Sequence, residues 1–215
     1  HYLKHQQILF RHIWQEDKGF RAARIRNRAI AASESDYLIL MDGDCIPDRF
    51  FVEDHMDLAQ KGCFFQGKRV LVEQEIVNRF HPDACDSIAK LMSFALKSQL
   101  SNRHHIFRLP FFPSYMKKGM SGIRSCNMGV YKKDLIAVNG FNHDFVGWGR
   151  EDSEIVARLY RYGLKRKENP FRAVCYHLWH PENDRGSLEK NDQLLEEIMQ
   201  NESFICKNGL NQLDV

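Results

Sequence analysis

The sequence has few of the features that mark secreted, membrane-spanning or nucleic-acid-binding proteins. Its six cysteines include no Cys-x-x-Cys pair and no framework spacing, which favours buried reduced thiols over a disulfide scaffold. No apolar run approaches the length of a membrane span, and the first residues carry no signal-peptide pattern. The formal net charge is only +3, so we expect no nucleic-acid partner. These absences predict a cytoplasmic protein.

The chain also lacks internal repeats and low-complexity tracts. With 215 residues, 43% of them hydrophobic, it can bury one substantial core. We therefore expect a single α/β domain over 1–215, with two halves, 1–102 and 103–215. The first residue is His1 rather than Met, so we expect the chain to begin inside a longer or processed protein.

Hydrophobic patterning predicts alternating strands and helices. Residues 7–15 alternate and are rich in β formers, 19–33 form an Ala-rich helix with four arginines, and 36–42 are a continuous apolar run typical of a central strand. Strand, helix and strand at this spacing predict a parallel βαβ unit. Further helices are expected at 48–61, 83–101 and 187–200, strands near 63–72, 125–131 and 173–176, and an irregular excursion that covers a site at 103–122.

An acidic turn follows the apolar run at 36–42. The residues YLILMDGDCIPD place Asp42, Asp44 and Asp48 within seven positions. Asp-Gly is ordinary turn material, and Asp48 after Pro47 could begin a helix. Two carboxylates flanking a glycine at the carboxyl end of a strand also suit a cation or phosphate site, because ligands gather at that edge of parallel sheets. The residue types leave both interpretations open.

A second acidic cluster lies in NGFNHDFVGWGREDSEIVARLYRYG, residues 139–163. Glu151 and Asp152 are expected in the first turn of a helix, where the helix dipole favours carboxylates. That structural role does not account for Trp148, which lies between two glycines just before them. An aromatic face beside carboxylates suits a sugar, because its apolar ring face stacks and its hydroxyls donate to the acids.

These two blocks, with VCYHLWHPE (174–182) and WQEDKGFRAARIRNRAIAAS (14–33), resemble family 2 glycosyltransferases of the GT-A fold. The later part is similar to the module shared by β-1,4-galactosyltransferases, polypeptide N-acetylgalactosaminyltransferases and chondroitin-polymerising enzymes. A lone Asp-x-Asp is a weak signal, whereas Asp-x-Asp, GWGxED and a downstream His in that order are specific. The resemblance covers about residues 14–182. It implies a Rossmann-like, mostly parallel central sheet flanked by helices, without the family's first nucleotide-binding strands.

The resemblance also implies an activity. A family 2 enzyme of this kind would be a metal-dependent, inverting glycosyltransferase that moves a hexose from a nucleoside diphosphate sugar, with UDP the expected nucleotide. The acceptor would be a saccharide or a lipid-linked saccharide, in surface polysaccharide or lipopolysaccharide synthesis. A lipid-linked acceptor would place the enzyme peripherally at the inner face of a membrane. Residues 1–102 would hold the nucleotide and metal, and residues 103–215 the acceptor.

Carried onto this sequence, the resemblance assigns the metal site. Asp44, the second Asp of Asp-x-Asp, would bind the metal, and Asp42 would lie beside the ribose and the metal's water shell. The third contribution would be His177, with His180 an open rival. A mixed carboxylate and imidazole set is compatible with Mn²⁺, and Mg²⁺ suits it less.

The same resemblance assigns the acceptor side. Asp152 would be the general base, Glu151 would bind the acceptor sugar, and Trp148 would lie on a loop that closes over both substrates.

Three further residues have a functional and a structural interpretation. Arg24 and Asn27 would approach the diphosphate, or would belong to the solvated face of their helix. Asn127 would line the donor-sugar pocket.

Two other functions stay open. A sugar nucleotidyltransferase shares the general sheet but usually has a Gly-rich basic N-terminal loop, which is not seen here. A non-catalytic carbohydrate- or metal-binding module is disfavoured by the intact Asp44, Glu151 and Asp152. The helix at 187–200 would serve either ordinary packing or a homodimer contact.

Overall fold

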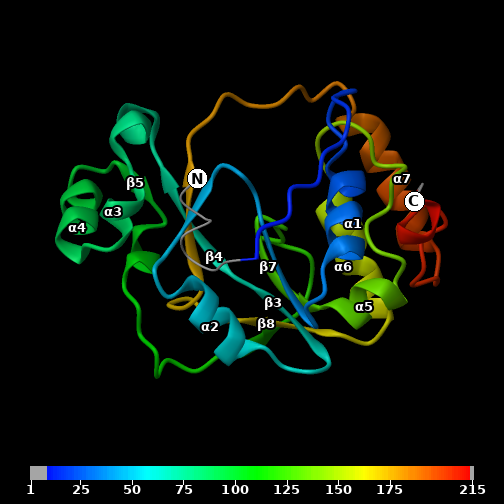
Figure 1. Cartoon of the computed structure of the whole chain (residues 1–215), viewed down its shortest axis with the longest axis horizontal. Coiled ribbons are helices and arrows are strands. Elements are labelled where there is room, and N and C mark those ends of the chain that lie inside the picture. Colours follow the sequence, from blue (N-terminus) through cyan, green and yellow to red (C-terminus); the bar gives the residue numbers. More distant parts are fainter. Residues whose placement is uncertain (1–8, 214–215) are drawn as a thin grey trace.

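The computed structural model describes residues 9–213 as an α/β fold in which helices flank two mixed sheets (Figure 1). The helices are α1 (Ala22–Ala32), α2 (Phe51–Leu58), α3 (Pro82–Cys85), α4 (Ile88–Leu96), α5 (Lys132–Ala137), α6 (Glu151–Arg161) and α7 (Leu188–Gln200), with 3₁₀ turns η2 (Gln74–Arg79), η3 (Arg103–Ile106) and η4 (Leu210–Gln212). The strands are β1 (Tyr37–Met41), β2 (Cys45–Pro47), β3 (Cys63–Gln66), β4 (Lys68–Val72), β5 (Leu100–Ser101), β6 (Tyr115–Lys117), β7 (Asn127–Tyr131), β8 (Lys165–Glu168) and β9 (Val174–Leu178). Figure 1 shows α1, α5, α6 and α7 on one side of the strands and α3 and α4 on the other.

The five-stranded sheet has the order β1-β7-β3-β8-β6, and only its β3–β8 pair is parallel. β1 pairs antiparallel with β7, from Tyr37 opposite Tyr131 to Met41 opposite Asn127. The expected mostly parallel central sheet and its parallel βαβ unit are therefore wrong for the described residues, whose sheets are mixed. Residues 9–15 form no regular strand there, and positions 7 and 8 of that prediction lie outside the described residues. An apolar run shows that a strand is covered but not which strand pairs with it.

The second sheet has the order β2-β9-β4-β5. Residues 63–72, expected as one strand, are split at Gly67 into β3 of the first sheet and β4 of the second. A Cβ on Gly67 would lie 2.1 Å from Oδ1 of Asn127, so only glycine lets the backbone pass there. The Asn127 amide donates to the carbonyl oxygens of Lys68 and Ala173, which fixes the two sheets beside each other.

The predicted helix at 83–101 is also interrupted. The α3 segment ends at Cys85, and Ser87 accepts a hydrogen bond from the backbone N–H of Lys90, so it caps a new helix, α4. Ser98, with φ of 56°, turns the chain sharply into β5. The predicted helices at 19–33, 48–61 and 187–200 are confirmed with slightly narrower bounds.

Two main apolar clusters fill the fold. The larger packs α1, α5 and α6 onto the five-stranded sheet around fully buried side chains that include Ile30, Met128 and Leu159. The second packs α3 and α4 onto the four-stranded sheet around Val70 and Phe80. In the described part of the chain, no helix has the length and apolar character needed to cross a membrane.

Candidate active site

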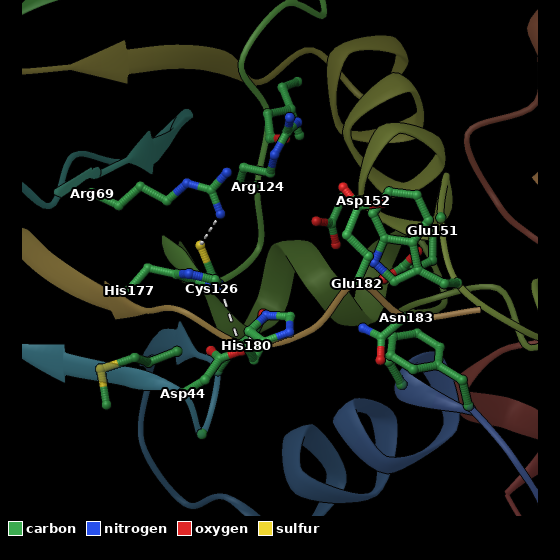
Figure 2. Close-up of a pocket in the computed structure, with 18 of the residues that line it drawn as sticks. Asp44, Arg69, Arg124, Cys126, Glu151, Asp152, His177, His180, Glu182 and Asn183 are labelled. Atoms are coloured by element: carbon green, nitrogen blue, oxygen red, sulfur yellow. Dashed lines mark hydrogen bonds and ion pairs between the residues drawn. The ribbon is translucent and has the colours of Figure 1, made fainter. Parts of the chain in front are cut away.

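One cavity of about 980 Å³ opens between α1, the start of α6 and the ends of β1, β4 and β9. Its lining contains the residues that the two acidic motifs and the downstream histidine block contribute, namely Asp42, Asp44, Trp148, Glu151, Asp152, His177 and His180. Figure 2 shows Asp44 and His180 on one side of this cavity and Glu151 and Asp152 on another. The fold therefore brings together side chains from three distant parts of the sequence.

Asp44 lies within reach of two imidazoles. Its Oδ2 is 3.5 Å from Nε2 of His177 and 3.2 Å from Nε2 of His180. The antiparallel pairing of β2 with β9 causes this, because Cys45 lies opposite His177 and the acidic turn precedes Cys45 directly. His177 and His180 were competing candidates, and the structure places both beside Asp44.

The three side chains can offer one ligand atom each, all within 4.8 Å of one another. They are the one such group found among the described residues. One carboxylate and two imidazoles suit a borderline divalent cation such as Mn²⁺ better than Mg²⁺, which prefers an all-oxygen shell. The donor set therefore fits the metal expected from the sequence.

Asp42 points toward an arginine instead of toward the histidines. Nη2 of Arg26 lies 2.9 Å from its Oδ1, while Nη1 of Arg26 lies 3.3 Å from Glu151 and 3.4 Å from Asp152. Burial raises the pKa of Asp42, and Arg26 opposes that shift. Burial also raises the pKa of Glu151, and the neighbouring Asp152 raises it further. A single guanidinium thus holds three carboxylates from both acidic motifs.

Arg26 was missed by reasoning from the sequence, which selected Arg24 and Asn27 on the same helix. The face of α1 that lines the cavity carries Ala22, Ile25 and Arg26, at the i, i+3, i+4 spacing of one helix face. This spacing groups Arg26 with Ala22 and Ile25 on one face, but only the structure shows that this face meets the cavity. Arg24 is not part of the lining.

Asn27 has a structural position. It is fully buried, its amide donates to the carbonyl oxygen of Phe141 at 2.7 Å, and its Oδ1 accepts from the Phe141 N–H at 2.8 Å. The expected contact of Asn27 with a diphosphate is therefore wrong, because its polar atoms are already used inside the core.

Asn127 is likewise a structural residue rather than part of this cavity's lining. Besides the two carbonyl oxygens of the sheet junction, it contacts Nε2 of the fully buried His55, which donates to its Oδ1 at 2.8 Å. Asp48 accepts from the backbone N–H of Phe50 at 2.9 Å in the turn just before α2. The N-cap of that helix is Phe50, so Asp48 is a turn residue and does not cap the helix.

The Asp152 carboxylate is held from two directions. Oδ1 faces Arg26, and Oδ2 accepts a hydrogen bond of 2.9 Å from the backbone N–H of Ser125. Gly149 and Arg150, both with positive φ, make the turn that begins α6 and aims its first residues at the cavity. Asp152 keeps a side-chain exposure of 21%, so it faces the cavity's interior and remains accessible.

Trp148 lines the cavity beside residues 179–187, of which the sequence analysis selected only His180 as a candidate. The guanidinium of Arg185 lies 5.3 Å from the Trp148 ring centroid. Arg185 belongs to residues 179–187, which cross from β9 to α7 (Figure 1) and add Trp179 and Glu182 to the lining. The excursion at 103–122 was expected to cover a site, but none of its residues lines this cavity. It adds the edge strand β6 instead.

Comparison with known proteins finds two matching families and two related proteins. The family described as glycosyl transferase family 2 matches residues 2–120, and the N-terminal domain of galactosyltransferase matches residues 106–181. Chondroitin synthase from Escherichia coli is 23% identical over 201 residues, which cover 82% of this chain and 28% of that protein. Hyaluronan synthase from Pasteurella multocida is 23% identical over 171 residues, 71% of this chain and 17% of that protein. The chain thus spans less than a third of the length of these curated relatives.

Proposed function

The chain belongs to glycosyltransferase family 2, and from this premise we propose that it is a metal-dependent, inverting hexosyltransferase. The donor is a nucleoside diphosphate sugar with UDP as the nucleotide, and the acceptor is a saccharide, in the synthesis of a surface polysaccharide or lipopolysaccharide. The observation that carries this proposal is the convergence of Asp44, His177 and His180 with Asp152 in one cavity. The similarity to two named polysaccharide synthases supports the polymer context.

Asp44, His177 and His180 are the residues that would hold the cation. A divalent cation bound there supplies positive charge for the departing diphosphate. Asp42 is paired with Arg26, which also contacts Glu151 and Asp152. We therefore assign Asp42 a role in positioning Arg26 and these two carboxylates rather than a direct bond to the metal.

Asp152 is the proposed general base. As the acceptor oxygen forms its bond to the anomeric carbon, the bond from that carbon to the diphosphate breaks and the hydroxyl proton passes to the Asp152 carboxylate. The Ser125 N–H and Arg26 hold this carboxylate in a fixed orientation throughout. Attack from the face opposite the leaving group inverts the configuration at that carbon. A well-placed base contributes about 10²- to 10⁴-fold in rate.

Glu151 and Trp148 are the proposed acceptor-binding residues. Glu151 is 8% exposed, and its carboxylate can accept hydrogen bonds from sugar hydroxyls beside Asp152. Trp148 offers an aromatic face on which an apolar sugar face can stack.

Calorimetric titration of UDP, with and without MnCl₂, tests the proposal on this chain. Loss of an outer partner of a metal ligand already costs about 10- to 100-fold in metal affinity, so loss of a ligand should remove the metal's effect. We expect Mn²⁺ to tighten UDP binding in the parent and Asp44→Asn to abolish that gain. Asp36→Asn is the matched control, since Asp36 is an exposed carboxylate just before β1. Absence of UDP binding with Mn²⁺, or an undiminished Mn²⁺ effect in Asp44→Asn, would contradict the proposal.

A further inference from the structure

Two arginines of the cavity have no carboxylate partner among the residues that the structure describes. Arg69 lies on β4, and Arg124 lies in the loop before β7; both line the cavity. Within residues 9–213, neither forms an ion pair with an Asp or Glu. Arg69 Nη1 donates to Sγ of Cys126 at 3.9 Å, and Arg124 Nη1 donates to the carbonyl oxygen of Ile123 at 2.5 Å.

The other arginines of the lining are already paired. Arg26 contacts three carboxylates, Arg150 pairs with Asp192, and Arg185 pairs with Glu182 at 3.0 Å. Most of the guanidinium N–H donors that remain for a ligand in this cavity therefore belong to Arg69 and Arg124. A guanidinium presents five donors in a rigid fork that matches the oxygens of a carboxylate or a phosphate.

Figure 2 shows Arg69 and Arg124 on the side of the cavity opposite Asp44 and His180. His177, the third residue of the proposed cation site, lies between Arg69 and Asp44 in that view, beside Cys126. Both arginines also line a smaller adjoining cavity of about 190 Å³, together with Cys126. Arg124 directly precedes Ser125, whose N–H holds the Asp152 carboxylate. A group bound by the arginines would thus lie near the proposed base.

We infer that Arg69 and Arg124 bind an acidic group, a carboxylate or a phosphate, on the saccharide acceptor. This inference rests on the proposed function, which leaves the donor's diphosphate to the cation held by Asp44 and the two histidines. The arginine pair would then select acidic acceptors over neutral ones, because charge-assisted bidentate hydrogen bonds form only with the anionic group.

Sugar binding can be followed by fluorescence, because Trp148 and Trp179 both line the cavity. With UDP and MnCl₂ present, the chain is titrated with glucuronic acid, glucose 6-phosphate and glucose. We expect at least one acidic sugar to bind about tenfold more tightly than glucose, a difference of about 1.4 kcal/mol. Arg69→Gln and Arg124→Gln should each bring that affinity close to that of glucose, and the preferred acid tells a carboxylate from a phosphate site. Arg79→Gln, an exposed arginine of η2 outside the lining, should leave the preference unchanged.

Three results would overturn the inference, and they differ from one another. Equal affinity of the parent for all three sugars would show that the arginines select no acidic acceptor. A matching loss of UDP affinity in the arginine variants would assign them to the donor's diphosphate, with the proposed function intact. Failure of the parent itself to bind UDP with Mn²⁺ would reject the proposed function and this inference together.

Discussion

Two sets of carboxylates in this molecule differ in how many arginine partners each acid has. One set lines the cavity, and the other is Asp54 of α2, which contacts the residues just before β9. In the cavity, one guanidinium, that of Arg26, is shared by Asp42, Glu151 and Asp152. The pKa values of Asp42 and Glu151 are raised, chiefly by burial, because one cation does not offset the loss of water around three acids.

Asp54 of α2 shows the reverse balance. It is 2% exposed and accepts hydrogen bonds from Arg108, from Arg172 and from the backbone N–H of Ala173. Burial acts to raise its pKa, but these donors lower it below the ordinary value. Asp54 has two guanidinium groups as direct partners, although Arg108 also contacts Glu53 and Arg172 also contacts Asp57, whereas three carboxylates of the cavity share the single guanidinium of Arg26. The number of donors that each buried carboxylate receives, rather than burial alone, separates the candidate site from the scaffold.

The largest effect that would test this comparison is on catalysis. Asp152→Asn keeps the shape of the side chain but leaves one acceptor oxygen for the two donors, Arg26 and the Ser125 N–H. It also removes the proton acceptor, so transfer should fall about 10²- to 10⁴-fold. UDP affinity with Mn²⁺ should stay close to that of the parent, because Asp152 lies outside the proposed metal group. Transfer is measured as acceptor-dependent release of UDP. Normal transfer by this variant would show that Asp152 is not the base.

The next effect is on stability. Asp54→Asn leaves Arg108 and Arg172 without their shared carboxylate, and breaking a buried ion pair in this way costs about 3–5 kcal/mol in the free energy of unfolding. Urea denaturation measures the loss. Asp57→Asn is the matched control, since Asp57 pairs with the same Arg172 but has a side-chain exposure of 56%, and should cost about 1 kcal/mol or less. Equal losses in the free energy of unfolding in the two variants would show that the buried Asp54 stabilises the fold no more than the exposed Asp57 does.

The smallest effect is a change in the pH dependence of stability. Asp42 and Glu151 have raised pKa values in the folded chain, so their ionisation opposes folding as the pH rises above the ordinary carboxyl pKa of about 4. Arg26→Gln removes the cation that limits this penalty. We expect a loss of about 1–3 kcal/mol at pH 7 that shrinks as the pH falls toward the ordinary carboxyl pKa, because the carboxyl groups of the folded chain are then increasingly protonated and need the cation less.

Unfolding in urea at pH 7, 5.5 and 4.5 measures this trend. Arg28→Gln is the control on the same helix, because Arg28 donates to the carbonyl oxygen of Trp14 and has no carboxylate partner in the described part of the chain. A loss that is independent of pH in Arg26→Gln would show that the three acids do not depend on this guanidinium for their charge.

The order of the motifs in the sequence predicted which residues line the site, but not which of them contact one another. The Asp-x-Asp turn, the GWGRED turn and the histidine block line one cavity as the sequence predicts, since each lies at the end of a strand or the start of a helix. Arg26 could not be chosen among the four arginines at 21–28 without knowing which face of α1 packs on the sheet. The role of His180 beside His177 required the pairing of β2 with β9, and Asn127 was misassigned because its amide closes the junction at Gly67.

The sequence by itself determined the helices near 19–33, 48–61 and 187–200, the apolar run of β1 and the residue types of the candidate site, because periodicity and turn chemistry act over a few neighbouring residues. Only the tertiary structure decided that β1 pairs antiparallel with β7, that Gly67 divides one run between two sheets, and that Arg26 joins Asp42 to Glu151, which lies 125 positions from Arg26 in the sequence. Strand pairing and shared counter-charges depend on contacts between distant segments, and no local pattern encodes which of several chemically similar partners will meet.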